Sequence, residues 1–289
     1  MPFIRNLWVA TLTDAGEDSG TESETVFIMN KSGLDVVHRD MRLFREVAEG
    51  GGSFTIMEVS ESQIVPEDYY LRVGIRGDDA WQPVVIAAWC QRFTSGNIVP
   101  LGYTEEIATI LSTDSSEGRI SLPLPRVVPG GIRSEISRVL LMTITHFLES
   151  ATDSAINVRI TRGDEVVVDH TIVDTPQSDF KSGQANLYFL PALAPFTRSQ
   201  LTDSSIELSI KGDDAWRPTT VVMFGLDRPS GNPGQIVPLV HLHPWKLGWL
   251  STDLDEGMPS VPPPARPSRP VSHSILARGA EGLREIANK

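Results

Sequence analysis

The chain has 289 residues, with 37 acidic side chains against 25 Lys and Arg, and a formal net charge of −12 at pH 7. This length predicts about two domains, and a hydrophobic content of 40% lets each of them bury an ordinary core. The acidic balance argues against a general nucleic-acid binder and against simple electrostatic attraction to anionic lipids. It leaves room for a bound cation such as calcium.

The single cysteine and the first residues bear on the compartment. Cys90 is the one cysteine, so no intrachain disulfide forms, and its place after an apolar run indicates a buried small hydrophobe. The N-terminus lacks a charged region followed by an apolar core, and no apolar stretch approaches the roughly 20 residues that span a bilayer. We expect a soluble, cytoplasmic protein without signal peptide or transmembrane segment, and a leaderless export route stays open.

Short alternating strands separated by polar, Gly-bearing turns follow one another through the first half. The pattern predicts strands over 3–13, 21–29, 54–59 and 69–76. Segment 34–50 is ambiguous, because its apolar spacing fits either a short amphipathic helix or irregular strands. This succession is typical of antiparallel sheets.

One motif of five residues occurs twice in the chain. Gly-Asp-Asp-Ala-Trp stands at 77–81 and again at 212–216, each time after an alternating strand and before an apolar run. Two other segments recur in the same order: 98–101 returns at 236–239, and 111–118 returns at 250–257. The separation between the copies grows steadily along the chain, which indicates one duplicated domain with small loop insertions in the second copy.

The repeats and the Pro-bearing exit from the first half predict the domain organisation. We expect an all-β protein with a first antiparallel β-sandwich over 1–125, a linker over 126–131 and a second β-sandwich over 132–262. Residues 263–289 form a Pro-rich linker and a short amphipathic peptide. The apolar residues of that peptide have helical spacing: Ile275, Leu276, Leu283 and Ile286.

The repeated motif has two interpretations. In the structural one, the glycine permits a turn, the aspartates accept hydrogen bonds from turn N–H groups and the tryptophan packs over the sandwich. In the other, the aspartates ligate calcium. One Asp-Asp pair cannot fill a shell of about 6–8 oxygens, so carboxylates from other loops would have to converge on it.

These motifs together resemble a known family. A strand that ends in Thr, a loop with Gly-Thr-Glu-Ser at 20–23 or Ala-Thr-Asp-Ser at 151–154, and the later Gly-Asp-Asp-Ala-Trp are similar to the PLAT domain. PLAT, or lipoxygenase-homology (LH2), domains are C2-like β-sandwiches, and the resemblance covers both halves but not the tail. It implies non-catalytic modules that approach membranes or partner proteins through loops at one end.

The resemblance also implies a calcium site in some members, with carboxylates in these two loops. The positions that match are Asp79 in the first copy and Asp153 and Asp214 in the second. The first copy departs from the family pattern, because Glu22 stands where the family has Asp. A calcium cofactor is therefore an expectation drawn from the family.

Four other residues near the end of the second half could carry function. His241 and His243 place two imidazoles on one strand face, a spacing seen in metal sites, but the sequence places no third ligand. Trp245 and Trp249 have no counterpart in the first copy and predict a contact patch or membrane-dipping loop, or core packing of at least one ring.

We therefore expect a non-enzymatic module of tandem PLAT-like domains that mediates protein or membrane-surface interaction, assisted by calcium, with no nucleic-acid partner. Trp245, Trp249 and the four apolar tail residues are the predicted binding positions. The alternative is a structural or cargo component of a multi-protein assembly that docks through 263–289. An enzyme that uses the His241–His243 region is a third hypothesis.

Overall fold

The computed structural model describes residues 4–31, 37–44, 50–58, 69–92, 98–147, 151–173, 180–202 and 204–261. Within these ranges the regular structure is strand, apart from one 3₁₀ turn at Arg198–Gln200. The predicted all-β class is confirmed. None of the described residues belongs to a helix long and apolar enough to cross a membrane.

The first half contributes two sheets. Its strands are β1 (Ile4–Thr13), β2 (Glu24–Lys31), β3 (Val37–Phe44), β4 (Gly52–Glu58), β5 (Tyr69–Arg76), β6 (Pro83–Arg92), β7 (Ile98–Glu105) and β8 (Ser121–Leu124). One sheet has the order β7-β6-β1-β4 and the other β3-β2-β5-β8. The ambiguous segment 34–50 forms strand over 37–44, because β3 pairs with β2 along its length.

The second half has a similar pair of sheets. Its strands are β9 (Val128–Pro129), β10 (Glu135–Thr145), β11 (Ala155–Arg162), β12 (Glu165–Ile172), β13 (Ala185–Thr197), β14 (Ile206–Lys211), β15 (Ala215–Trp216), β16 (Pro218–Leu226), β17 (Gln235–Leu242), β18 (Leu250–Ser251) and β19 (Ser260–Val261). The orders are β13-β10-β16-β17-β9 and β12-β11-β14-β19. The short β9 lies inside the predicted linker and pairs in parallel with β17.

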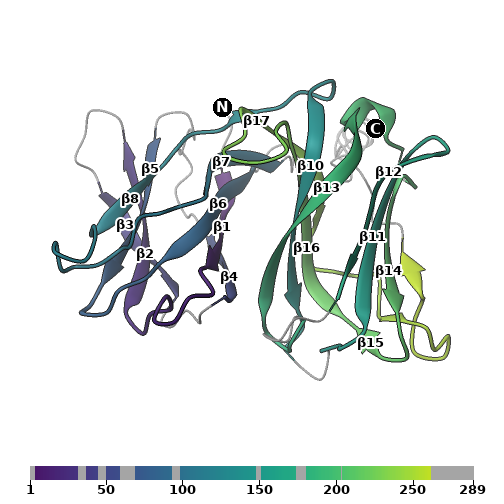
Figure 1. The fold of residues 1–289 in the computed structure, drawn as a ribbon, viewed down its shortest axis with the longest axis horizontal. Coiled ribbons are helices and arrows are strands. Elements are labelled where there is room, and N and C mark those ends of the chain that lie inside the picture. The colour runs from purple at the N-terminus through teal and green to yellow at the C-terminus, as the bar shows by residue number, and fades with distance from the viewer. Residues whose placement is uncertain are drawn as a thin grey trace, which may run out of the picture.

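The strands are arranged in four successive layers, which Figure 1 shows from the purple first half to the green and yellow second half. The two middle layers belong to one nine-stranded sheet, because β4 and β13 pair where Gly52 faces Ala185. A Cβ at Gly52 would lie 2.5 Å from the carbonyl oxygen of Ala185. Only glycine allows the two strands to approach this closely.

Three hydrophobic cores explain the apolar runs of the sequence. Successive side chains of a strand point to opposite faces, so in β1 Leu7 and Val9 enter the first core while Trp8 and Ala10 face the other way. Those two residues join a third core between the halves, together with Leu140 and Phe224 of the second half. The strands of the middle layers are therefore apolar on both faces. The boundary at 126–131 and the duplicated origin stay predictions.

Candidate binding face

The first copy of the repeated motif is fixed by contacts to two other loops. Trp81 is fully buried, and its Nε1 donates to Thr13 Oγ1 at 3.0 Å. Gly77 has a φ of +133°, and a Cβ there would lie 2.3 Å from Ser23 Oγ. Asp79 accepts from the Glu22 N–H and the Ala80 N–H, each at 2.8 Å. The hydrogen bond from Glu22 is the main cause that lowers the pKa of the Asp79 carboxyl.

The second copy repeats these contacts. Trp216 Nε1 donates to Thr145 Oγ1 at 2.9 Å, and Gly212 has a φ of +145°. Asp214 accepts from the Asp153 N–H at 3.3 Å and from the Ala215 N–H at 2.8 Å. The structural interpretation of the motif is confirmed: glycine makes the turn, aspartate binds N–H groups across loops, and tryptophan is buried.

A second repeated loop packs beside the first in each half. Thr113 Oγ1 donates to the Gly77 carbonyl, and Thr252 Oγ1 donates to the Gly212 carbonyl at 2.6 Å. Within each loop a serine hydroxyl donates to the glutamate five residues later: Ser112 to Glu117 at 3.1 Å and Ser251 to Glu256 at 3.2 Å. The recurrent segments 111–118 and 250–257 are thus matching turns.

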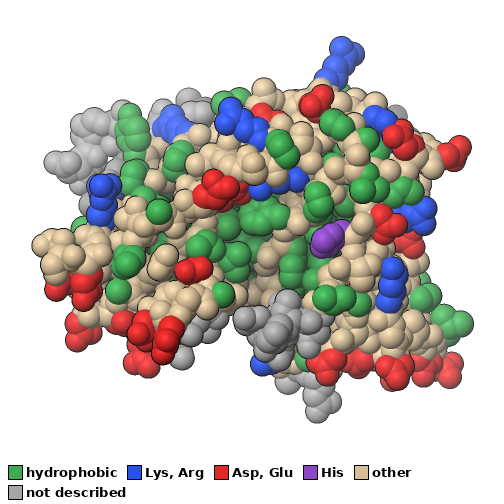
Figure 2. Space-filling view, in the orientation of Figure 1, with side chains coloured by type: hydrophobic (Ala, Val, Ile, Leu, Met, Phe, Trp, Pro, Cys, Tyr) green, Lys and Arg blue, Asp and Glu red, His purple; other side chains and the backbone are tan. Residues whose placement is uncertain are grey.

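Both loop pairs lie at the same end of the molecule. Leu12 and Ala185 both pair with Gly52, and Ala185 also pairs with Ile144, so these strand ends lie side by side. Thr13 and Thr145, which hold the two motif tryptophans, follow directly after Leu12 and Ile144. We call this end, with its exposed carboxylates, the acidic end: Asp78, Asp79, Asp114, Glu117, Asp213, Asp214, Asp253, Asp255 and Glu256. Figure 2 shows acidic side chains along the lower edge of both halves.

The three predicted calcium ligands are placed at two separate sites, one in each half. Asp153 and Asp214 lie together in the second half, while Asp79 lies in the first. The part of the chain that the structure describes gathers no group of three or more His, Cys, Asp or Glu that could hold a metal. The Asp79 and Asp214 carboxylates accept from loop N–H groups, and two carboxylates at one site do not supply a shell of about 6–8 oxygens. The calcium assignment stays a prediction from the resemblance.

His241 of β17 and His243, just after that strand, pack against the first half. The His241 and His243 rings each meet the Trp8 ring edge-on, with centroids 4.8 Å apart. Burial lowers the pKa of His241 to about 4 and also lowers the pKa of His243. His243 Nδ1 lies 2.8 Å from Thr220 Oγ1. Their role in the described structure is contact between the halves.

The two tryptophans of the predicted patch have different surroundings. Trp245 is 7% exposed, belongs to the hydrophobic core of the second half and donates from Nε1 to the Gly248 carbonyl at 2.7 Å. Its ring is buried in the core, which is one of the two alternatives that the sequence allowed. Trp249 is partly exposed, with the Arg217 guanidinium 5.9 Å from its ring centroid. A contact role for Trp249 stays a prediction, and Ile275, Leu276, Leu283 and Ile286 lie outside the described residues.

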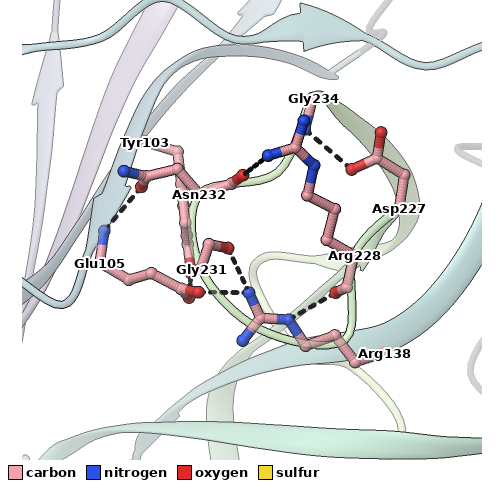
Figure 3. Close-up of polar contacts among 8 residues, drawn as sticks. All are labelled: Tyr103, Glu105, Arg138, Asp227, Arg228, Gly231, Asn232 and Gly234. Carbon is pink, nitrogen blue, oxygen red and sulfur yellow. Dashed lines mark hydrogen bonds and ion pairs between the residues drawn. The ribbon is translucent and has the colours of Figure 1, made fainter.

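A buried polar network between the halves was missed by the sequence reasoning (Figure 3). Arg138 of β10 forms an ion pair with Glu105 of β7, and both are less than 10% exposed, at 7% and 6%. Arg138 also donates to the carbonyls of Arg228 at 2.9 Å and Gly231 at 2.7 Å. Tyr103 donates to Glu105, and its pKa is raised by burial and this carboxylate. The available signal was an arginine inside the apolar strand β10.

The same network fixes the loop between β16 and β17. Glu105 N–H donates to Asn232 Oδ1 at 3.0 Å, and Arg228 Nη1 donates to the Asn232 carbonyl at 3.2 Å. The Gly234 N–H donates to Asp227 Oδ1 at 2.9 Å. This loop of the second half is therefore held against β7 of the first (Figure 3).

No protein-family model, curated protein or solved structure matches the chain. The PLAT resemblance rests on the short motifs described above. The candidate binding face consists of two matching acidic loop pairs at one end of two joined, sandwich-like halves.

Proposed function

We propose that the protein is a non-catalytic binding module whose two halves present their acidic loop ends to one protein or membrane surface. The observation that carries the proposal is the common placement of the two Gly-Asp-Asp-Ala-Trp loops at the acidic end. Loops on a fixed scaffold are where proteins place recognition, because they vary without disturbing the sheets. The PLAT-like character belongs to the same proposal.

The junction between the halves supports this function. The third core and the Arg138–Glu105 pair bury side chains from both halves, so the two loop pairs keep a fixed spacing. When two contact sites belong to one rigid body, both can bind the same surface, and no entropy is lost in ordering a linker between them. A surface with matching repeats would be bound more tightly than a single site.

The negative charge of the acidic end limits the kinds of surface that it can bind. The exposed carboxylates of the acidic end repel an anionic lipid surface unless a cation lies between them. The proposal therefore has two forms, a cationic protein surface or a membrane bridged by calcium. The two forms differ in whether binding requires calcium, which an experiment can add or remove.

Co-sedimentation with vesicles of phosphatidylserine and phosphatidylcholine tests the membrane form. With calcium we expect the full chain to pellet, and with a chelator to remain in the supernatant. Asp214→Asn keeps an oxygen that accepts the Asp153 N–H but removes the charge, so pelleting should fall about tenfold if calcium binds there. Glu207→Gln, which changes a carboxylate on β14 away from these loops, is the matched control.

Absence of pelleting in both conditions contradicts the membrane form. Retention of the chain on a cationic peptide array, reduced by the same Asp214→Asn substitution, then supports the protein form. Failure in both assays, with the fold intact by circular dichroism, removes the binding proposal.

A further inference from the structure

A groove of about 640 Å³ lies beside β5 and β8 in the first half. Tyr70, Pro123 and Pro125 line it, and Tyr70 is 58% exposed. Arg72 and Arg126 also line it, and the Arg126 guanidinium lies 5.4 Å from the Tyr70 ring centroid. The charges among its lining residues are both positive. We call it the Tyr70 groove; an apolar side chain flanked by carboxylates matches its chemistry.

The acidic end carries a segment in which an exposed apolar side chain is flanked by two carboxylates. Leu254 is 77% exposed between Asp253 and Asp255. The turn is pre-formed, because the Asp253 N–H donates to Ser251 Oγ at 3.1 Å and the Asp255 N–H donates to Asp253 Oδ1 at 2.9 Å. A turn fixed before binding loses little conformational freedom on docking.

The first half offers an internal comparison. Its turn has the same bonds, with the Asp114 N–H on Ser112 Oγ at 3.0 Å and the Ser116 N–H on Asp114 Oδ1 at 2.8 Å. The residue at the tip is Ser115 in place of Leu254. The framework of the turn therefore does not require leucine, and nothing within the described residues covers its side chain.

The groove and the leucine turn are placed at opposite ends of the molecule. β5 runs from Tyr69, beside the groove, to Arg76, which directly precedes Gly77 at the acidic end. Eight residues of strand separate the two ends by about 23 Å. The turn also belongs to the other half, so it cannot reach the groove of its own chain while both halves keep their positions.

We propose that copies of this chain associate head to tail, with the Leu254 turn of one copy seated in the Tyr70 groove of the next. Leu254 would pack on Tyr70 and the prolines, while Asp253 and Asp255 would face Arg72 and Arg126. The two surfaces differ, so the contact is heterologous and leaves one free turn and one free groove on every open oligomer. The inference builds on the proposed function, since the turn belongs to the acidic end.

Sedimentation velocity of the full chain over a concentration series tests the association. We expect the mean mass to rise with concentration at about 50 mM salt and less at about 500 mM, because salt screens the charge pairs. Leu254→Ser, which copies the tip of the first half, should weaken association about thirtyfold. Ser115→Ala, at the equivalent tip, should leave it unchanged.

A mixing experiment separates this contact from any symmetric one. Arg72→Glu should disrupt the groove surface and Leu254→Ser the turn surface, so at about 3 µM, well below the weakened Kd, each variant alone should stay largely monomeric. Mixed together they retain one intact groove and one intact turn, and they should form a 1:1 dimer and nothing longer. Tyr70→Ala provides a second groove variant, with circular dichroism to verify the fold.

Three results would overturn the inference: a monomeric wild-type chain up to about 100 µM, where a contact with a Kd near the micromolar range would be populated; association that Leu254→Ser does not weaken; or no dimer in the mixture. Vesicle or peptide binding by such a monomer would leave the proposed function standing.

Discussion

At the scale of single residues, the buried Arg138–Glu105 pair should be costly to break. Arg138→Ala would leave the Glu105 carboxylate 6% exposed without its cation, and the free energy of unfolding should fall by about 3–5 kcal/mol. The exposed pair Arg162–Glu165 provides the control, because Arg162→Ala should cost about 1 kcal/mol or less. Urea denaturation of both variants measures the difference, and equal losses would contradict the role given to Arg138.

At the scale of elements, the β4–β13 junction depends on a missing side chain. In Gly52→Ala the new Cβ would lie 2.5 Å from the Ala185 carbonyl oxygen, so the strands must separate, with a loss of about 1–3 kcal/mol. Gly131→Ala is the control, since its Cβ meets only Ser134 Oγ at 4.0 Å. Thermal unfolding measures the loss of stability in both variants. Amide exchange should accelerate in β4 and β13 of the first variant, and unchanged exchange there would refute the junction.

The strand pattern and its failures also belong to the element scale. Alternation predicted the strand over 69–76, because the side chains of one face are buried and Tyr70, Arg72 and Arg76 on the other face are exposed. The repeats predicted matching turns, which the hydrogen bonds of Ser112 and Ser251 confirm. The pairing of Gly52 with Ala185 and of Glu105 with Arg138 could not be predicted, because one sequence carries no signal for contacts between distant segments. Trp245 could not be placed either, since tryptophan suits both a core and a surface.

At the scale of the whole molecule, acid should weaken the junction between the halves. His241 packs on Trp8 of the other half, and its pKa falls from 6.5 to about 4 on folding. The unfolded chain therefore binds more protons between these values, so the stability that neutral His241 preserves is present above pH 6.5 and is lost as pH falls. Between pH 7.5 and 5 the loss attributable to His241 should be about 2 kcal/mol.

Comparison with His241→Gln isolates this contribution, because His243, whose pKa is also lowered by burial, contributes to the loss of stability over an overlapping pH range. The wild-type chain should lose more unfolding free energy than the variant between the two pH values, while His170→Gln, on β12 of an outer layer, should behave like wild type. Parallel pH profiles for all three chains would show that His241 does not couple the halves to pH.

The third core has a consequence for how the chain reaches its folded state. Its members come from both halves of the sequence, such as Trp8, Trp89, Leu140 and Phe224, and they pack on the sheet faces that each half turns towards the other. Contacts between such distant segments are late and slow, because the intervening chain must first be ordered. A nascent half would meanwhile expose Trp8 and Trp89 to solvent. The second half therefore shields the apolar face of the first from solvent only once both halves have folded.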